Sequence, residues 1–206
     1  MTEIKKEQPY NPLDKKNLGG SVAEALLSKP VGPLPPEEAF VGAGIYALYY
    51  IGPFPEYEYI ARCNINDAYA LPIYVGKAVP AGARKGGYGL GESPGTVLYK
   101  RLAEHAKSIE QTGNLQLADF RCRYLVVDDI WIPLGENLLI EVFQPLWNKF
   151  IDGFGNHDPG GGRYNQKNSP WDVIHPGRSF AAKLQSSEKT HDEWRAAISN
   201  FLGEKS

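Results

Sequence analysis

The chain has 206 residues, 42% of them hydrophobic, and a formal net charge of −2. This length predicts one domain with appendages, since a typical domain has about 150 residues. No window of about 18 apolar residues exists and the polar N-terminus lacks a signal segment, so we expect a soluble, cytoplasmic protein without a membrane partner.

The chain divides into three parts by composition. Residues 1–40 form an N-terminal arm, in which a short apolar-periodic run is followed by four prolines. Residues 41–150 carry most of the apolar periodicity and are expected to form the core. Residues 151–206 form a C-terminal extension that is rich in glycine up to residue 178. We therefore expect one folded core with two appended segments.

The apolar pattern of the core predicts a small α/β sandwich of order β-β-α-β-α with long insertions. In chain order, the expected elements are a short helix at 22–27, strands at 41–51 and 71–75, a helix at 97–109, a strand at 120–127, and helices at 136–143 and 191–202. The segment 78–95 holds six glycines and two prolines and reads as a long loop. Loops of this size are uncommon and often functional.

Charge is unevenly distributed along the chain. Residues 77–123 hold eight basic and four acidic residues, a net charge of +4, whereas residues 1–76 sum to −3 and residues 124–148 to −4. A net negative charge argues against nucleic acid, but a positive middle segment fits a local phosphate-binding face. An ordinary solvated helix would give the same scatter, so charge alone does not decide the partner.

Two strands each place a tyrosine beside a glycine, in Gly44-Ile45-Tyr46 and in Tyr74-Val75-Gly76-Lys77. Single tyrosines on strands are usually core residues, but other polar residues accompany these two. Arg101 and His105 are four residues apart, so they share one helix face. Glu136 and Asn148 follow at a separation of twelve residues, with a helix and a proline between them.

This order of residues resembles the GIY-YIG nuclease superfamily, whose members cut DNA with a metal ion. The resemblance implies a three-stranded antiparallel sheet flanked by helices, with the two motif tyrosines on adjacent strands. Tyr50-Ile51-Gly52 also spells the second motif, but Tyr50 would share a strand and a face with Tyr46. We therefore assign the second motif to Tyr74. The 27 residues between Tyr46 and Tyr74 then imply an insertion.

The resemblance also implies roles for these residues. Glu136, expected in the first turn of its helix, would hold one Mg²⁺, for which Mn²⁺ could substitute. Glu141 is a rival carboxylate, but it lies too close to Asn148 for the family spacing. Cys63 and Cys122 have no metal-binding spacing, and we expect reduced thiols. One carboxylate suits Mg²⁺, which keeps several waters and also binds substrate phosphate.

The other implied roles concern the proton and the phosphate. Tyr46 or His105 would serve as general base, and the sequence does not choose between them. Arg101, Tyr74 and Lys77 would contact the phosphate. Asn148 would orient Glu136 or a phosphate oxygen.

Longer stretches resemble the Type II restriction endonucleases of this superfamily that cut CCGCGG. These are residues 71–82, Pro145-Leu146-Trp147-Asn148, residues 152–157 and residues 171–178. The resemblance implies a homodimer on a palindromic double-stranded site. Candidate DNA-binding residues lie in the loops, and they are Arg84, Lys85, Asn156, His157, Arg163, Asn165, Gln166, Lys167 and Arg178. Two alternatives are a structure-specific repair or recombination nuclease and a catalytically silent DNA-binding module.

Overall fold

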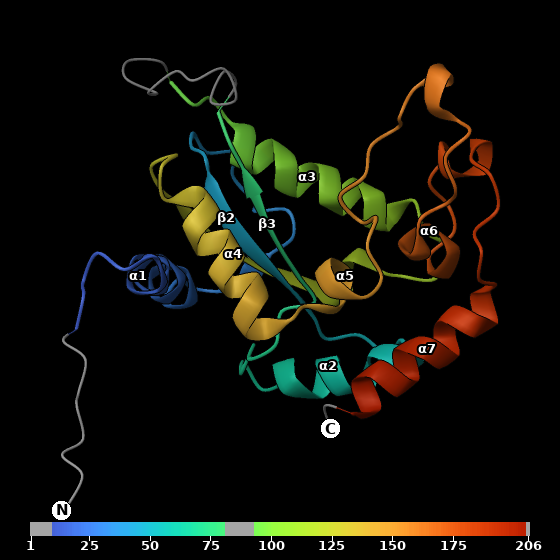
Figure 1. Cartoon of the computed structure of the whole chain (residues 1–206), viewed down its shortest axis with the longest axis horizontal. Helices are drawn as coiled ribbons and strands as arrows, with labels where there is room; N and C mark the ends of the chain where they lie inside the picture. The colour runs from blue at the N-terminus through green and yellow to red at the C-terminus, as the bar shows by residue number, and fades with distance from the viewer. Residues whose placement is uncertain (1–9, 81–92, 205–206) are drawn as a thin grey trace, which may run out of the picture.

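The computed structural model describes residues 10–80 and 93–204, and its centre is one antiparallel sheet of four strands (Figure 1). In space the strands follow the order β1-β4-β2-β3. Their bounds are Gly32–Pro33 for β1, Gly44–Tyr50 for β2, Tyr74–Ala78 for β3 and Phe120–Val126 for β4. The expected strands at 41–51 and 120–127 are confirmed as β2 and β4, and the second expected strand is present as β3 but begins at Tyr74 rather than at 71. The expectation of only three strands is wrong, because the arm adds β1 beside β4 at an edge, where proline is tolerated.

Helices pack on both faces of this sheet (Figure 1). Their bounds are Lys15–Leu27 for α1, Glu58–Asn64 for α2, Val97–Glu110 for α3, Ile132–Phe143 for α4, Leu146–Lys149 for α5, Pro170–Ile174 for α6 and His191–Gly203 for α7. The side chains of β2 alternate between two clusters, as the two-residue period of a strand requires. Ile45 and Ala47 pack with α1 and α4, whereas Tyr46 and Leu48 pack with α3. The result is a central sheet between two helical layers.

Two helices begin earlier than the sequence pattern predicted. α1 begins at Lys15 rather than at 22, because the Asp14 side chain caps it by accepting from the Lys16 N–H. The α1 glycine Gly19 permits a close crossing with α4, since a Cβ there would lie 3.1 Å from the Leu134 carbonyl oxygen. α4 begins at Ile132, so Glu136 lies in its second turn and not, as expected, in its first.

The expected insertion between β2 and β3 contains a 3-10 turn, Pro55–Tyr57, followed by α2. The helix α7 is confirmed, and it carries a capping box formed by Thr190 and Glu193. An ion pair between Arg195 and Glu56 joins α7 to the insertion, so the C-terminal extension packs against the core (Figure 1). No helix in the described part of the chain is long and apolar enough to cross a bilayer.

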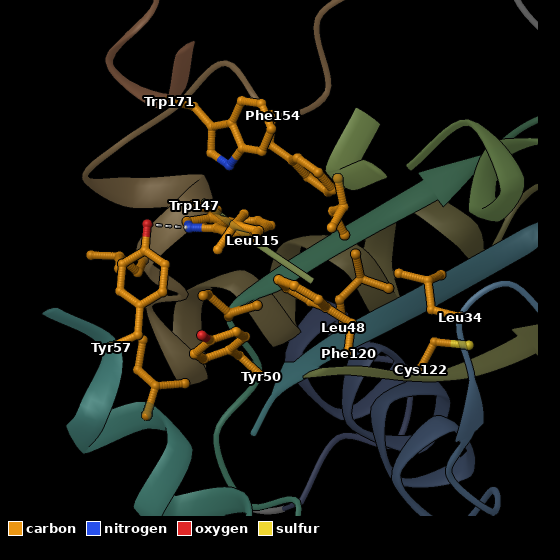
Figure 2. Packing of buried hydrophobic residues seen from close by; sticks show 14 of the residues in the cluster. Leu34, Leu48, Tyr50, Tyr57, Leu115, Phe120, Cys122, Trp147, Phe154 and Trp171 are labelled. Carbon is orange, nitrogen blue, oxygen red and sulfur yellow. Dashed lines mark hydrogen bonds between the residues drawn. The ribbon is translucent and has the colours of Figure 1, made fainter. Parts of the chain in front are cut away.

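The larger core cluster is rich in aromatic rings and lies on the α3 side of the sheet. Trp147 of α5 donates its indole N–H to the Tyr57 hydroxyl over 3.1 Å and contacts Phe154, with ring centroids 4.5 Å apart (Figure 2). Trp171 of α6 stands against Trp147 at 5.6 Å. The extension thus contributes the buried rings of Phe154 and Trp171 to this cluster, and Phe154 contacts Tyr74 of the second motif.

Candidate active site

The two motif tyrosines lie on adjacent strands and on one face of the sheet. β2 and β3 pair so that Tyr46 stands opposite Gly76 and Leu48 stands opposite Tyr74. The rings of Tyr46 and Tyr74 have centroids 6.2 Å apart. Tyr50 instead packs against Phe120 in the core, and its hydroxyl accepts from the Phe54 N–H. This geometry favours Tyr74 over Tyr50 as the tyrosine of the second motif.

Both motif glycines are required by close approach. A Cβ on Gly76 would collide with the Tyr46 hydroxyl, so only glycine lets the Tyr46 side chain lie across β3. A Cβ on Gly44 would collide with the Leu125 carbonyl oxygen of the neighbouring strand β4. Packing alone therefore requires glycine at these two positions, whether or not the tyrosines take part in catalysis.

Tyr46 and His105 form a buried pair. The Tyr46 hydroxyl lies 2.5 Å from His105 Nε2. Burial raises the pKa of Tyr46 well above its ordinary value, with a smaller increase from Tyr74 and an opposing effect from Arg101. Burial and the charge of Arg101 lower the pKa of His105 well below its ordinary value. At neutral pH a protonated Tyr46 therefore donates to a neutral His105.

Arg101 lies one helical turn before His105 and reaches the same region. Its Nη1 lies 2.6 Å from His157 Nε2 and donates to Glu104 over 3.1 Å, while Nη2 donates to the Gly155 carbonyl over 3.0 Å. Burial raises the pKa of Tyr74, as it does that of Tyr46, and the charge of Arg101 opposes both shifts. Arg101 thus lies between the tyrosine pair and the loop that holds Gly155 and His157.

Glu136 approaches from α4, on the other side of β3. Its carboxylate accepts from the Lys77 ammonium over 2.6 Å, and its side chain is 14% exposed. The charge of Glu136 raises the pKa of both Tyr46 and Tyr74, which places it within electrostatic range of the tyrosines. Because β3 is an edge strand, groups from both helical layers can meet along its free edge.

Asn148 follows α4 and attaches to the same free edge of β3. Its Oδ1 accepts from the Val75 N–H and its Nδ2 donates to the Val75 carbonyl, both over 2.8 Å. Both polar atoms of the Asn148 side chain therefore bind the Val75 backbone, and neither binds Glu136. Asn148 instead satisfies the backbone of the second motif, which an edge strand would leave unpaired.

The expected DNA-binding residues divide into three groups. Arg84 and Lys85 lie outside the described residues. A polar hollow of about 340 Å³ beside the Arg101 contact is lined by Asn156, His157, Arg163, Gln166 and Lys167, together with Gly155. Asn165 is exposed nearby. Lys167 also pairs with Glu188 over 2.5 Å. The loops thus gather five of the expected residues around one hollow.

Arg178 is placed differently from the expectation. It is 2% exposed, and its guanidinium donates to both oxygens of Asp172 and to backbone carbonyls of residues 153, 154 and 156. All five N–H donors of an arginine are then used. Contrary to the expectation, Arg178 has no donor left for a base or a phosphate.

Two residues at the site were missed by the sequence analysis. The ring of Phe154 stacks on His105, with centroids 4.4 Å apart and an interplanar angle of 17°. Gly155 leaves room for Tyr74 and Arg101, since a Cβ there would lie 3.0 Å from the Tyr74 hydroxyl. The signal that could have found them is an aromatic residue between two glycines, a string that suits close packing of backbone against side chains.

The oxygen ligands available for the expected magnesium ion are few. No group of three or more His, Cys, Asp and Glu residues in the described ranges could hold a metal by itself. Glu136 supplies one carboxylate that is partly open to solvent and within electrostatic range of the tyrosines. A single carboxylate that is completed by substrate phosphate and water fits the preference of Mg²⁺.

Comparison with known families identifies the fold. A family model described as the Eco29kI GIY-YIG domain matches residues 38–202. This range contains both tyrosine motifs, α3, α4 and most of the C-terminal extension. No curated protein matches the chain.

Proposed function

The chain belongs to the Eco29kI family of GIY-YIG domains, a family of restriction endonucleases, and we propose that it is a homodimer that cuts double-stranded DNA at CCGCGG with Mg²⁺. The family makes it a deoxyribonuclease domain with sequence-specific cleavage. The observation that carries the proposal is the meeting of four groups at the edge of β3. These are the hydrogen-bonded pair of Tyr46 and His105, the cation of Arg101 and the carboxylate of Glu136.

Tyr46 and His105 are proposed to act as one unit. A water attacks the phosphorus and gives its proton to Tyr46, which passes its own hydroxyl proton to His105 Nε2. The 2.5 Å contact and the neutral state of His105 support this transfer. Tyr46 is 0% exposed, so water must gain access when DNA binds. Arg101 is the group that a phosphate would draw away from the tyrosines, because guanidinium binds phosphate bidentately.

The metal is proposed to bind Glu136 together with a phosphate oxygen of the DNA. When bound, Mg²⁺ stabilises the charge that develops on the phosphate and on the leaving 3′ oxygen. Lys77 must release the carboxylate for this, and the phosphate supplies a second partner for the freed ammonium. Mn²⁺ would suit the same oxygen ligands.

Base recognition is proposed for the polar hollow and for Arg84 and Lys85. A site of G·C pairs calls for Arg or Lys donors to guanine and for amide or acidic acceptors to cytosine. The hollow offers both kinds of group in Arg163, Lys167, Asn156 and Gln166. A two-fold dimer would place two copies of this surface on the two halves of a palindrome.

The test is a digest of plasmid and random-library DNA by the whole chain with Mg²⁺, with Glu136→Gln as the inactive control. Discrete bands whose sequenced ends share CCGCGG would support the full proposal. Bands with another common sequence would retain the restriction enzyme and reject the site. Cuts only at branched DNA would point to a structure-specific nuclease, and binding without cuts to a silent DNA-binding module. Light scattering with a CCGCGG duplex would test the dimer.

A further inference from the structure

Four successive carbonyl groups, those of residues 153–156, accept hydrogen bonds from two arginines. The carbonyls of Gly153, Phe154 and Asn156 accept from Arg178 at 2.8, 3.0 and 3.1 Å. The carbonyl of Gly155, in the middle of the run, accepts from Arg101 at 3.0 Å. The 153–156 segment therefore connects a fully buried arginine to the arginine of the candidate active site.

The buried arginine is itself rigidly held. Arg178 and Asp172 form two parallel hydrogen bonds of 2.7 Å, and both side chains are 1% exposed. The guanidinium also lies over the rings of Trp171 and Phe180, at 4.5 and 4.8 Å from their centroids. Asp172 accepts a further bond of 2.6 Å from the Ser169 hydroxyl. A planar fork with every donor used leaves Arg178 a single orientation.

The Phe154 side chain of the 153–156 segment reaches His105 and Tyr74. The Phe154 ring stacks on His105 at 4.4 Å and meets the edge of Tyr74 at 5.0 Å. On its opposite side it contacts Trp171 at 5.1 Å, beside the Arg178 guanidinium. The backbone of the segment thus touches Arg101, while its one ring touches His105 and Tyr74.

We propose that the ion pair of Asp172 and Arg178 is a positioning device for the reaction, which fixes the 153–156 segment and through it sets the places of His105 and Arg101. The inference rests on the proposed nuclease function of that site. A purely structural ion pair would hold the extension to the core without any effect on His105 or Arg101. Both members of the pair are positioning residues, since neither touches the reacting groups.

The first experiment needs no cleavage. Arg178→Lys keeps the charge but removes the fork, and Asp172→Asn keeps the size but removes the charge. We expect the chemical shifts of the His105 ring, measured by nuclear magnetic resonance in the DNA-free protein, to change in both variants. We also expect the pKa of His105 to move closer to the ordinary value of a histidine. Glu56→Gln, which breaks the ion pair between the insertion and α7, is the matched control and should leave these signals unchanged.

The second experiment is single-turnover cleavage beside DNA affinity. We expect Arg178→Lys to lower the cleavage rate about 100-fold while the Kd for DNA stays near that of the unmodified protein, because a displacement of about 1 Å at a reacting group has that effect. Glu56→Gln should cleave at the unmodified rate. A folded Arg178→Lys variant with unchanged His105 signals and unchanged rate would overturn the proposal.

A third variant keeps the proposal open to test if breaking the ion pair unfolds the chain. Phe154→Leu leaves the four carbonyls of the segment in place and removes the ring that stacks on His105 and also contacts Tyr74, Trp147 and Trp171. A lowered rate in a variant that is still fully folded at the assay temperature supports the positioning role, and an unchanged rate rejects it. If the unmodified protein cuts no DNA, the nuclease assignment fails, whereas the His105 signals still decide whether the ion pair positions that ring.

Discussion

Lys77 and Glu136 form an ion pair of 2.6 Å, so the carboxylate expected to hold the metal is neutralised by a cation of the chain itself in the DNA-free protein. The two residues come from β3 and α4, the elements that meet at the free edge of the sheet. Lys77 is 40% exposed and can turn toward solvent or toward a phosphate. The relationship couples metal binding to DNA binding, since a phosphate competes with Glu136 for the same ammonium.

Lys77→Met should therefore raise the affinity of the DNA-free protein for Mn²⁺ by up to about fivefold, because a partly exposed ion pair contributes about 0.2–1 kcal/mol. The same variant should bind DNA more weakly. Calorimetric titration with Mn²⁺ measures the first effect. Lys100→Met, on the exposed surface of α3, is the matched control. An unchanged Mn²⁺ affinity for Lys77→Met would show that the ammonium does not compete with the metal.

Gly76→Ala should lower the single-turnover cleavage rate about 100-fold, because displacing a reacting group by about 1 Å has that effect. The added methyl collides with the Tyr46 hydroxyl and ring, so Tyr46 must leave its place beside His105. Gly113→Ala, where a Cβ meets nothing within 4 Å, is the control and should cleave normally. Full activity of Gly76→Ala would show that cleavage does not require Tyr46 in its position beside His105.

The Tyr46 and His105 pair can be tested for joint action. Tyr46→Phe and His105→Ala should each lower the single-turnover rate by about 100-fold or more, as general acid–base groups do. The double variant should lose much less than the product of the two losses, since groups that act as a unit are non-additive. Rapid-quench kinetics on one cognate duplex measures all three. Strictly multiplicative losses would mean that the 2.5 Å contact carries no proton in the reaction.

Part of this site was predictable from the sequence because it depends on regular spacing. The four-residue separation of Arg101 and His105 requires only a helix, and Tyr46 and Tyr74 require only two paired strands. The sequence pattern places Glu136 in the first turn of its helix rather than the second, because the pattern does not extend back to the turn that holds Pro133. Pro at the start of a helix is in fact favourable, since its missing N–H has no partner there.

The other residues of the site depend on contacts between loops, whose sequences have no regular spacing of apolar residues. Arg178 was expected to bind DNA because a basic residue in a polar loop usually faces solvent, and its five buried bonds follow from a fold that a local pattern does not show. The register of β1 with β4 is likewise set by packing of the arm. Phe154 and Gly155 became part of the site only because α6 and Arg178 fix the backbone around them.

Two buried histidines should make the stability of the protein depend on pH. Burial lowers the pKa of His175 to about 3 and that of His105 well below its ordinary value. The unfolded chain therefore binds more protons below about pH 6.5, and stability falls as pH decreases, by about 1.4 kcal/mol per pH unit for each histidine. In urea unfolding between pH 6 and 5, the free energy of unfolding of the unmodified protein should change with pH about twice as steeply as that of His105→Gln. The control His191→Gln, whose imidazole is 44% exposed, should keep the full slope.

Arg101 should change one partner when DNA binds, exchanging His157 for a phosphate of the scissile strand while Nη2 keeps the Gly155 carbonyl. Arg101→Ala should then reduce the slope of log K against log salt by about 0.9 for each protomer on the site, because each lost phosphate contact releases fewer counterions. Arg101→Lys should keep that slope but cleave more slowly, since an ammonium lacks the planar fork that grips a phosphate with two bonds. Arg62→Ala, on the exposed surface of α2, is the matched control and should leave both slope and rate unchanged. Filter binding to a CCGCGG duplex at several salt concentrations, without metal, measures the slope before any cut is made. If Arg101→Ala keeps the full slope, the guanidinium makes no phosphate contact in the complex and serves to position the loop rather than the phosphate.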